Sequence, residues 1–232
     1  MDADRKIKAE KLRQIKQRII NRTKPKKNPF LAITISVSFV FIIIALLTWR
    51  FSNFTQLSDA EQNSITYKKM KILLLNNESR AALVYRVSKK FNLPPLLVTS
   101  IIYAESSNHK YAVSHAGALG LMQIMPAVAV ERAVIRKHYF LSRLIKIYPR
   151  ILFNEILNVY FGCEELNWLK KHVRGWDSIL HSYNGGINAF KRGFRNRPYA
   201  RKILFNWKYW KKLSLKQIKI YKAKITYGKF RE

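Results

Sequence analysis

The sequence has little cysteine and few acidic residues. Cys163 is its single cysteine, so no disulfide can form within the chain and packing alone must hold the core together. Cys163 lies among apolar residues, which predicts a buried packing residue rather than a nucleophile. Only 13 Asp and Glu residues oppose 44 Lys and Arg residues, and the net charge is +31. That charge indicates a polyanionic neighbour: nucleic acid, an anionic membrane surface or an acidic wall polymer.

Several motifs that carry chemistry are also absent. The sequence has no P-loop, no G-x-G-x-x-G and no G-x-S-x-G motif. Its histidines show no H-x-x-x-H spacing and have no cysteine partners, so they predict no metal site. We interpret them as surface or packing residues and expect neither a metal nor another cofactor; they are His109, His115, His138, His172 and His181.

One long apolar run lies near the N-terminus. Residues 30–49, FLAITISVSFVFIIIALLTW, carry no charge, and 20 helical residues span about 30 Å, the thickness of a bilayer's hydrocarbon core. The run is too long for a simple signal sequence and no small-residue cleavage site follows it, so we predict an uncleaved transmembrane signal anchor over residues 29–50. Residues 1–28 are basic, whereas 51–66 contain no Lys or Arg. The positive-inside rule then places residues 1–28 in the cytoplasm and the rest of the chain outside.

The rest of the chain predicts one mainly α-helical domain. Residues 51–66 are predicted to be a polar, flexible linker, 67–213 the folded domain, and 214–232 a basic tail of undecided structure. Apolar residues recur at helical spacing through the domain, with no convincing strand alternation. The expected helices cover 68–91 (one or two helices), 95–107, 126–137, 153–171, 176–183, 187–190 and 199–213, and residues 108–124 are expected to form an irregular loop.

The residues most suggestive of chemistry lie between Leu96 and Pro126. In the predicted helix, Glu105 follows Leu97 and Ile101 at intervals of four, so its carboxyl lies at the end of an apolar stripe. Burial disfavours a charged carboxylate and raises its pKa towards neutrality, as a general acid requires. The alternative is a helix-terminal glutamate that simply reaches solvent. Glu105 is the only acid between Ser79 and Val130, and the glycine-punctuated loop GALGLMQ follows it.

Several motifs occur in a fixed order over roughly residues 84–213. In chain order they are E-S at 105–106, A-V-S at 112–114, GALGLMQ at 117–123, M-P at 125–126, N-V-x-x-G at 158–162, SYNGG at 182–186 and YARKIL at 199–204. In this order and spacing they resemble the lytic transglycosylase family of peptidoglycan-cleaving enzymes. The resemblance implies a lysozyme-like α domain behind the single transmembrane helix.

The resemblance implies that Glu105 is the single catalytic acid/base. It would protonate the glycosidic oxygen between N-acetylmuramic acid and N-acetylglucosamine, then deprotonate the muramic C6 hydroxyl, which closes a 1,6-anhydro ring. Ordinary glycosidases need two carboxylates, whereas here the substrate supplies the nucleophile. Other acids that could still fold nearby are Glu131, Glu155, Glu164, Glu165 and Asp177.

The resemblance also implies a substrate site formed by Ser106, Ser114, Met122, Gln123, Tyr183 and Asn184. Gln123 would bond the sugar's acetamido group, Met122 would line the cleft, and Tyr183 would place its hydroxyl near the acid. Asn184 would contact the sugar, and the two serines would be polar supports. Core packing is the alternative for Met122. Nearby cations oppose burial in setting the pKa of Glu105, and we predict that burial has the larger effect if the lysines face outward.

The combined prediction is a lytic transglycosylase anchored in the bacterial inner membrane, with its catalytic domain in the periplasm. Expected partners are peptidoglycan glycan strands and the membrane through residues 30–49, with anionic lipids or an envelope-spanning assembly as further candidates. One alternative is a goose-type-like muramidase that hydrolyses the same bond. Another is a non-catalytic basic binding protein on a lysozyme-like scaffold, although the predicted exterior location argues against nucleic acid as its partner.

Overall fold

The computed structural model describes residues 57–228, with side chains described as far as residue 223. Within this range the chain is helical apart from isolated bridges, which confirms the mainly α prediction for the described part. The predicted basic segment 1–28 and anchor 29–50 lie outside the described residues. Among residues 57–228, no helix is both long enough and apolar enough to span a bilayer.

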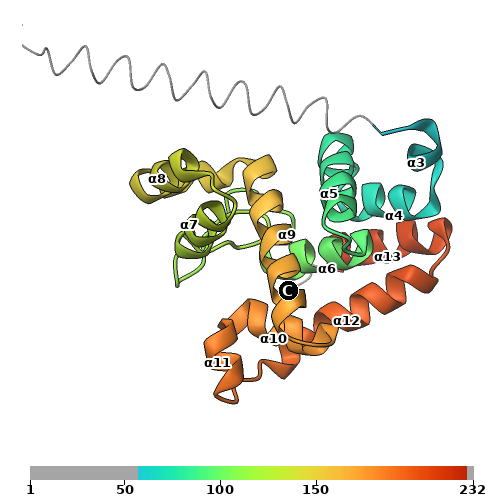
Figure 1. Ribbon diagram of the computed structural model, residues 1–232. Coiled ribbons are helices and arrows are strands. Elements are labelled where there is room, and N and C mark those ends of the chain that lie inside the picture. The colour runs from blue at the N-terminus through green and yellow to red at the C-terminus, as the bar shows by residue number, and fades with distance from the viewer. Residues whose placement is uncertain (1–56, 229–232) are drawn as a thin grey trace, which may run out of the picture. The chain divides into compact units, whose positions relative to one another are not determined.

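The helices follow one another through short connections, apart from the longer loop between α6 and α7 (Figure 1). In chain order they are α3 (Asp59–Asn63), α4 (Ile65–Leu73), α5 (Glu78–Lys90), α6 (Pro95–Ser106), α7 (Pro126–Ile135), α8 (Tyr139–Ile147), the 3₁₀ helix η1 (Pro149–Phe153), α9 (Glu155–His172), α10 (Trp176–Gly185), α11 (Ile187–Lys191), α12 (Arg197–Lys212) and α13 (Leu215–Gly228).

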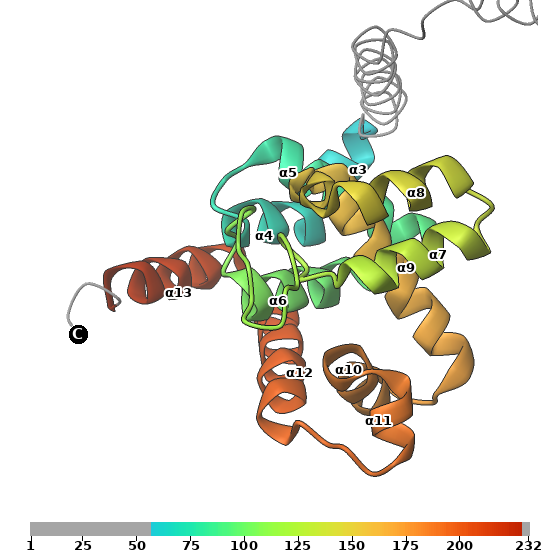
Figure 2. The same ribbon diagram turned by 90° about the vertical axis from the view of Figure 1, so that its left-hand side faces the viewer.

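Helix α6 lies in the middle of this unit, with α4 above it and α12 below it in Figure 2. Pro95 occupies its first turn, where a missing N–H costs nothing, and Ser107 ends it in a left-handed conformation. Leu97 and Ile101 have no exposed surface. The apolar stripe predicted from the sequence therefore faces the core and leads to Glu105 in the last turn.

The loop between α6 and α7 is irregular, as predicted, with single bridges from Leu119 to Val113 and Ile124. Asn158 of α9 holds this loop and has no exposed surface. Its side-chain oxygen accepts from the Met122 N–H at 2.7 Å. Its amide nitrogen donates to the carbonyls of Leu119 at 2.7 Å and Leu152 at 2.9 Å. One side chain thus satisfies three backbone groups that no regular element would pair.

Two glycines make this contact possible. Gly120 has a φ of +78°, and a Cβ there would collide with the Asn158 amide. Gly162, one turn along α9 from Asn158, lies against the Met122 sulfur, and a Cβ there would collide with it. Close approach of the loop to α9 therefore explains the spacing of the N-V-x-x-G motif. Cys163 beside it is fully buried, and burial raises the pKa of its thiol, which fits the predicted packing role.

The helical unit extends beyond the predicted limits of 67 and 213. Residues 58–66 were expected to be linker, but Ser58 and Glu61 form a capping box that starts α3. The basic tail continues as α13, which packs against α4 and buries Ile218. Helix α8 was also not predicted. Its amphipathic, cation-rich pattern places only Ser142 and Ile145 fully in the interior.

Helix α12 is held at its C-terminal end by a buried lysine. The Lys69 ammonium of α4 donates to the carbonyls of Trp210 at 3.1 Å and Lys211 at 3.0 Å. A cation at this position also complements the negative end of the helix dipole. Burial lowers the pKa of Lys69. The far end of α12, where Tyr199 lies, contacts α6 and α10.

Replacing Asn158 by alanine is expected to destabilise the domain by about 3 kcal/mol, because three buried backbone groups lose their partner. Chemical denaturation of residues 57–232 measures the change. The same replacement at the exposed Asn188 of α11 is the control and is expected to cost less than about 0.5 kcal/mol. Equal costs at the two positions would contradict the role assigned to Asn158.

Candidate active site

Glu105 projects from the last turn of α6 and meets a hydroxyl from α12. Tyr199, in the first turn of α12, donates a hydrogen bond from its hydroxyl to Oε1 of Glu105 at 2.5 Å. Hydrogen bonds to an ionised carboxylate are short and strong, and this one fixes the direction of the carboxyl. The alternative of a glutamate that simply reaches solvent therefore does not fit, since this carboxyl is mostly buried and bonded.

The environment of Glu105 raises its pKa from 4.5 to about 7. Burial is the largest cause, because it disfavours the charged form. The Tyr199 hydrogen bond and the positive charge of Lys202 both lower the pKa, but by less. Burial therefore outweighs the nearby cation, as predicted. A carboxyl with a pKa near 7 is able both to give up and to take back a proton at neutral pH.

Tyr199, and not Tyr183, makes the hydrogen bond to Glu105. The Tyr183 hydroxyl donates to the Met122 carbonyl at 2.8 Å instead of to Glu105. Tyr183 still lies close enough that the charge of Glu105 helps to raise its pKa. Tyr199 was noted only as part of the YARKIL motif, because nothing local marks its contact with a residue 94 positions away.

Three of the expected site residues serve the loop and not the cleft. Met122 has no exposed surface and packs against Gly162, which is the core alternative. Ser106 is buried and donates to the Leu121 carbonyl at 2.8 Å, so it ties the end of α6 to the loop. The Ser114 hydroxyl accepts from the Ala118 N–H at 3.0 Å and shapes the turn before Leu119.

Gln123 is partly exposed and has a fixed orientation. Its backbone is left-handed, with a φ of +49°. Its side-chain nitrogen donates to the carbonyls of Ala112 at 3.1 Å and Gly120 at 2.9 Å. Both amide hydrogens are thus directed at the loop, and the carbonyl oxygen is the group available to accept from a ligand N–H.

Asn184 is exposed at the end of α10. Its side-chain oxygen accepts from the Asn196 amide at 2.8 Å, which joins the end of α10 to the N-cap of α12. This hydrogen bond holds together the two helices that carry Tyr183 and Tyr199. It leaves the Asn184 amide nitrogen as the group that remains to contact a sugar.

The other acids that the sequence left open are each paired with a basic side chain. Glu155 accepts from buried Arg80 at 2.9 and 2.6 Å, and Glu164 accepts from Arg136 twice at 2.8 Å. The remaining pairs are Glu131–Arg132, Glu165–Arg132 and Asp177–His181. No acid contributes to the pKa shift of Glu105. In residues 57–228, no group of three or more His, Cys, Asp or Glu side chains is placed to hold a metal ion.

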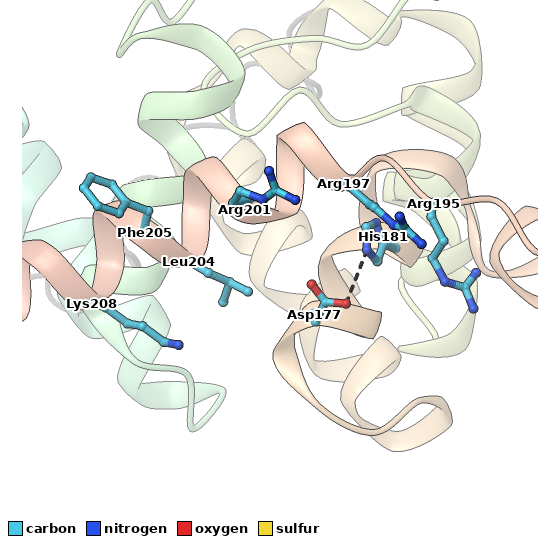
Figure 3. Close-up of a pocket in the computed structure, with 8 residues that line it drawn as sticks. All are labelled: Asp177, His181, Arg195, Arg197, Arg201, Leu204, Phe205 and Lys208. Carbon is cyan, nitrogen blue, oxygen red and sulfur yellow. Dashed lines mark ion pairs between the residues drawn. The ribbon is translucent and has the colours of Figure 1, made fainter.

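A separate basic concavity of about 590 Å³ lies between α10 and α12 (Figure 3). Three arginines and a lysine line it, together with Leu204, Phe205 and the Asp177–His181 pair; the cations are Arg195, Arg197, Arg201 and Lys208. Arg197 and Arg201 each lie two residues from Tyr199, about 200° around the helix. The concavity is therefore on the opposite face of α12 from Glu105 and is separate from the Glu105 site.

The Transglycosylase SLT domain matches residues 83–206, which is more than half of the chain. The chain therefore belongs to the SLT transglycosylase family. All the elements of the Glu105 site, from α6 to the first turns of α12, fall inside the matched range.

Similar proteins include two membrane-bound lytic murein transglycosylases C. That of Haemophilus ducreyi is 36% identical over 143 residues, covering 56% of this chain and 38% of that protein. That of Actinobacillus pleuropneumoniae (strain L20) is 31% identical over 148 residues, covering 59% and 40%. A transglycosylase of Enterobacteria phage PRD1 is 29% identical over 119 residues, covering 51% and 39%. The chain thus spans about two fifths of the length of the curated relatives it matches.

Among solved structures, the X-ray structure of an inactive mutant of the lytic transglycosylase Slt from Pseudomonas aeruginosa is similar. Its TM-score is 0.48 at 21% sequence identity, and the match covers 56% of this chain and 23% of that one.

Replacing Tyr199 by phenylalanine is expected to raise the pKa of Glu105 above its value of about 7, because the hydroxyl that stabilises the carboxylate is lost. Titration of the Glu105 carboxyl carbon by NMR measures the shift. Tyr183→Phe is the matched control, since its hydroxyl bonds Met122 and not Glu105. An unchanged pKa in Tyr199→Phe would show that this hydrogen bond does not act on the acid.

Glu105 also makes stability depend on pH. Its pKa in the folded state is about 7, above the ordinary 4.5. Its contribution to the free energy of unfolding is therefore fully present below about pH 4.5 and is lost as the pH rises through 7. Glu105→Gln cannot ionise, and its stability relative to wild type is expected to increase from pH 4.5 to 7 and then level off. Urea denaturation across this range measures the difference, with Glu131→Gln as the control for loss of an exposed negative charge. Parallel stability curves for wild type and Glu105→Gln would contradict the raised pKa.

Proposed function

We propose that this protein is a peptidoglycan lytic transglycosylase, and that Glu105 is its single acid/base. The observation that carries this proposal is a largely buried carboxyl with a pKa of about 7, held by Tyr199. Membership of the SLT transglycosylase family and the similarity to lytic murein transglycosylases support the substrate class. The proposed domain is a lysozyme-like α domain.

In the first step, protonated Glu105 gives its proton to the oxygen that links C1 of N-acetylmuramic acid to N-acetylglucosamine. The C1–O bond breaks, and the N-acetylglucosamine side leaves with a free hydroxyl. A pKa near 7 suits this role, since a large fraction of the carboxyl keeps its proton at neutral pH. The carboxylate that results accepts the Tyr199 hydrogen bond, which stabilises its charge.

In the second step, the Glu105 carboxylate takes the proton of the muramic C6 hydroxyl. The C6 oxygen attacks C1 and closes a 1,6-anhydro ring, and Glu105 returns to its protonated form without consuming water. A hydrolase would need a second group to activate water. The ion pairs of Glu155, Glu164 and Glu165 favour the transglycosylase route, because each carboxylate is already engaged.

Substrate contacts are assigned to the two exposed amides of the site. The Gln123 carbonyl oxygen would accept from an acetamido N–H of the glycan, since its own hydrogens are bound to the loop. Asn184 lies where the end of α10 meets the start of α12, and its amide nitrogen would donate to a sugar oxygen. Ser106, Ser114 and Met122 would act by fixing the loop that carries Gln123.

The location proposed for this activity is the periplasmic side of the inner membrane. The charge-free run 30–49, the basic residues before it and the lack of Lys and Arg in 51–66 support a single anchor with the domain outside. Relatives named membrane-bound lytic murein transglycosylase C support an association with the membrane.

The test is product analysis after incubation with purified peptidoglycan. Mass spectrometry is expected to find muropeptides that end in 1,6-anhydromuramic acid. Glu105→Gln should lower their release by about 10²–10⁴-fold, the usual contribution of a general acid. Glu131→Gln, the same change at an exposed carboxylate with 59% side-chain exposure, is the matched control and should remain active.

The outcomes separate the alternatives. Reducing muramic ends would replace the transglycosylase proposal by hydrolysis. Full activity in Glu105→Gln would remove Glu105 from the chemistry. No release by folded wild-type protein would favour a binding role on the same scaffold.

A further inference from the structure

The stretch from the end of α7 through α8 exposes several large apolar side chains. Between residues 134 and 148, six of them are 45–74% exposed: Val134 and Ile135 at the end of α7, Tyr139, Phe140 and Ile147 on α8, and Tyr148 directly after it. We call this set, with the cations described next, the α8 face. A clustered apolar surface of this kind is uncommon on a soluble protein and marks a contact with a partner or a membrane.

The same stretch carries cations and no acid. Residues 132–154 contain no Asp or Glu. Arg132 and Arg136 are paired with acids of other segments. Four further cations are exposed and have no ion pair within residues 57–228: Lys137, Arg143, Lys146 and Arg150. The exposed apolar groups and these cations therefore occur together in one short stretch of the chain.

Helical spacing places three of these residues on the outer side of α8. Ser142 and Ile145 face inward, where α8 packs on α7. Phe140, Arg143 and Ile147 follow at intervals of three and four and lie on the outer side. An amphipathic helix with aromatic and basic residues on its exposed side matches segments that lie in the interface of a bilayer.

Helix α8 lies at the same end of the described unit as α3, its first helix. Helices α8 and α3 lie at the same, upper end of the described unit in both views, whereas α11 lies at the lower end (Figures 1 and 2). Seven residues, 50–56, separate the charge-free run from the first described residue, Leu57. Seven extended residues reach at most about 25 Å. An anchor at 30–49 would therefore keep the α3 end of the domain near the membrane.

We propose that the α8 face docks on the anionic leaflet of the membrane in which the chain is anchored. Tyr139, Phe140 and Ile147 enter the headgroup boundary, and the four unpaired cations bind lipid phosphates. Each cation near an anionic surface contributes about 1 kcal/mol, or about fivefold in binding. This inference goes beyond the proposed function, because it assigns a second lipid contact to the catalytic domain.

The chemistry of the α8 face favours a bilayer over other occupants. A second copy would bring the same positive charges together, and repulsion would oppose the pairing. A glycan strand offers no hydrocarbon for Phe140 and Ile147. An anionic bilayer interface is the partner that satisfies the apolar groups and the cations at the same time.

The proposal can be tested by labelling a single introduced cysteine. Its one cysteine, Cys163, is fully buried, so a cysteine introduced at the surface is the reactive thiol. An environment-sensitive fluorophore is placed at Phe140→Cys of the full chain, reconstituted in vesicles of phosphatidylethanolamine with phosphatidylglycerol. Phe205→Cys is the matched control, since Phe205 is 61% exposed and lies between the cations Arg201 and Lys208, on a different face.

The label at position 140 is expected to shift to the blue and to be quenched by nitroxide-bearing lipid, and the label at 205 is not. Both effects at position 140 should weaken in vesicles of phosphatidylcholine alone. Replacing Arg143 and Lys146 by Gln should lower the ratio of docked to undocked α8 by about tenfold or more. Equal signals at positions 140 and 205, or no dependence on lipid charge, would overturn the proposal. Crosslinking of two α8 faces without lipid quenching would assign the surface to a second copy instead.

The result is independent of the catalytic proposal. Phe140 and Ile147 are not part of the Glu105 site, so Phe140→Ser is expected to release glycan products at the wild-type rate in detergent. In the chain labelled at position 140, replacing Ile147 by Ser should weaken the lipid contact of the label, and loss of that contact with unchanged release would support the α8 face as a docking surface. Docking without any release of products would leave this inference intact and contradict the proposed function.

Discussion

The structure around Glu105 depends on the amide of Asn158. The loop between α6 and α7 has no strand or helix to pair its backbone, and a buried polar backbone without partners costs free energy. Asn158 satisfies the Met122 N–H and the Leu119 carbonyl, and it ties both to the Leu152 carbonyl. These hydrogen bonds fix the part of the loop from Leu119 to Met122. They also fix the backbone position of Gln123, the next residue after Met122.

The acid itself is set by opposing effects on one carboxyl. Burial alone would raise the pKa of Glu105 above 7. Further hydrogen-bond donors to the carboxylate, or a closer cation, would lower the pKa towards 4.5. One hydroxyl from Tyr199 and the charge of Lys202 leave the pKa at about 7. The pKa of Glu105 is thus set by burial, which raises it, and by two residues of α12, which lower it.

The sequence predicted those parts of the structure that local spacing controls. The stripe from Leu97 to Glu105 and the proline at the start of α6 identify the helix and the acid, and both lie within a few turns. The contact of Tyr199 with Glu105 could not be predicted in this way, because it depends on how α12 packs against α6. Helices α8 and α13 were not predicted, although amphipathic spacing is a helix signal, because basic residues interrupt their apolar positions and few of their described side chains are buried.

Helix α12 is held at both ends, by Tyr199 on Glu105 and by Lys69 beneath its last carbonyls. Its 16 residues make a rod about 24 Å long. One helix thus joins the Tyr199–Glu105 hydrogen bond to α4, and the tail helix α13 packs on α4 in turn. The basic tail is therefore connected by packing to the helix that positions the Tyr199 hydroxyl.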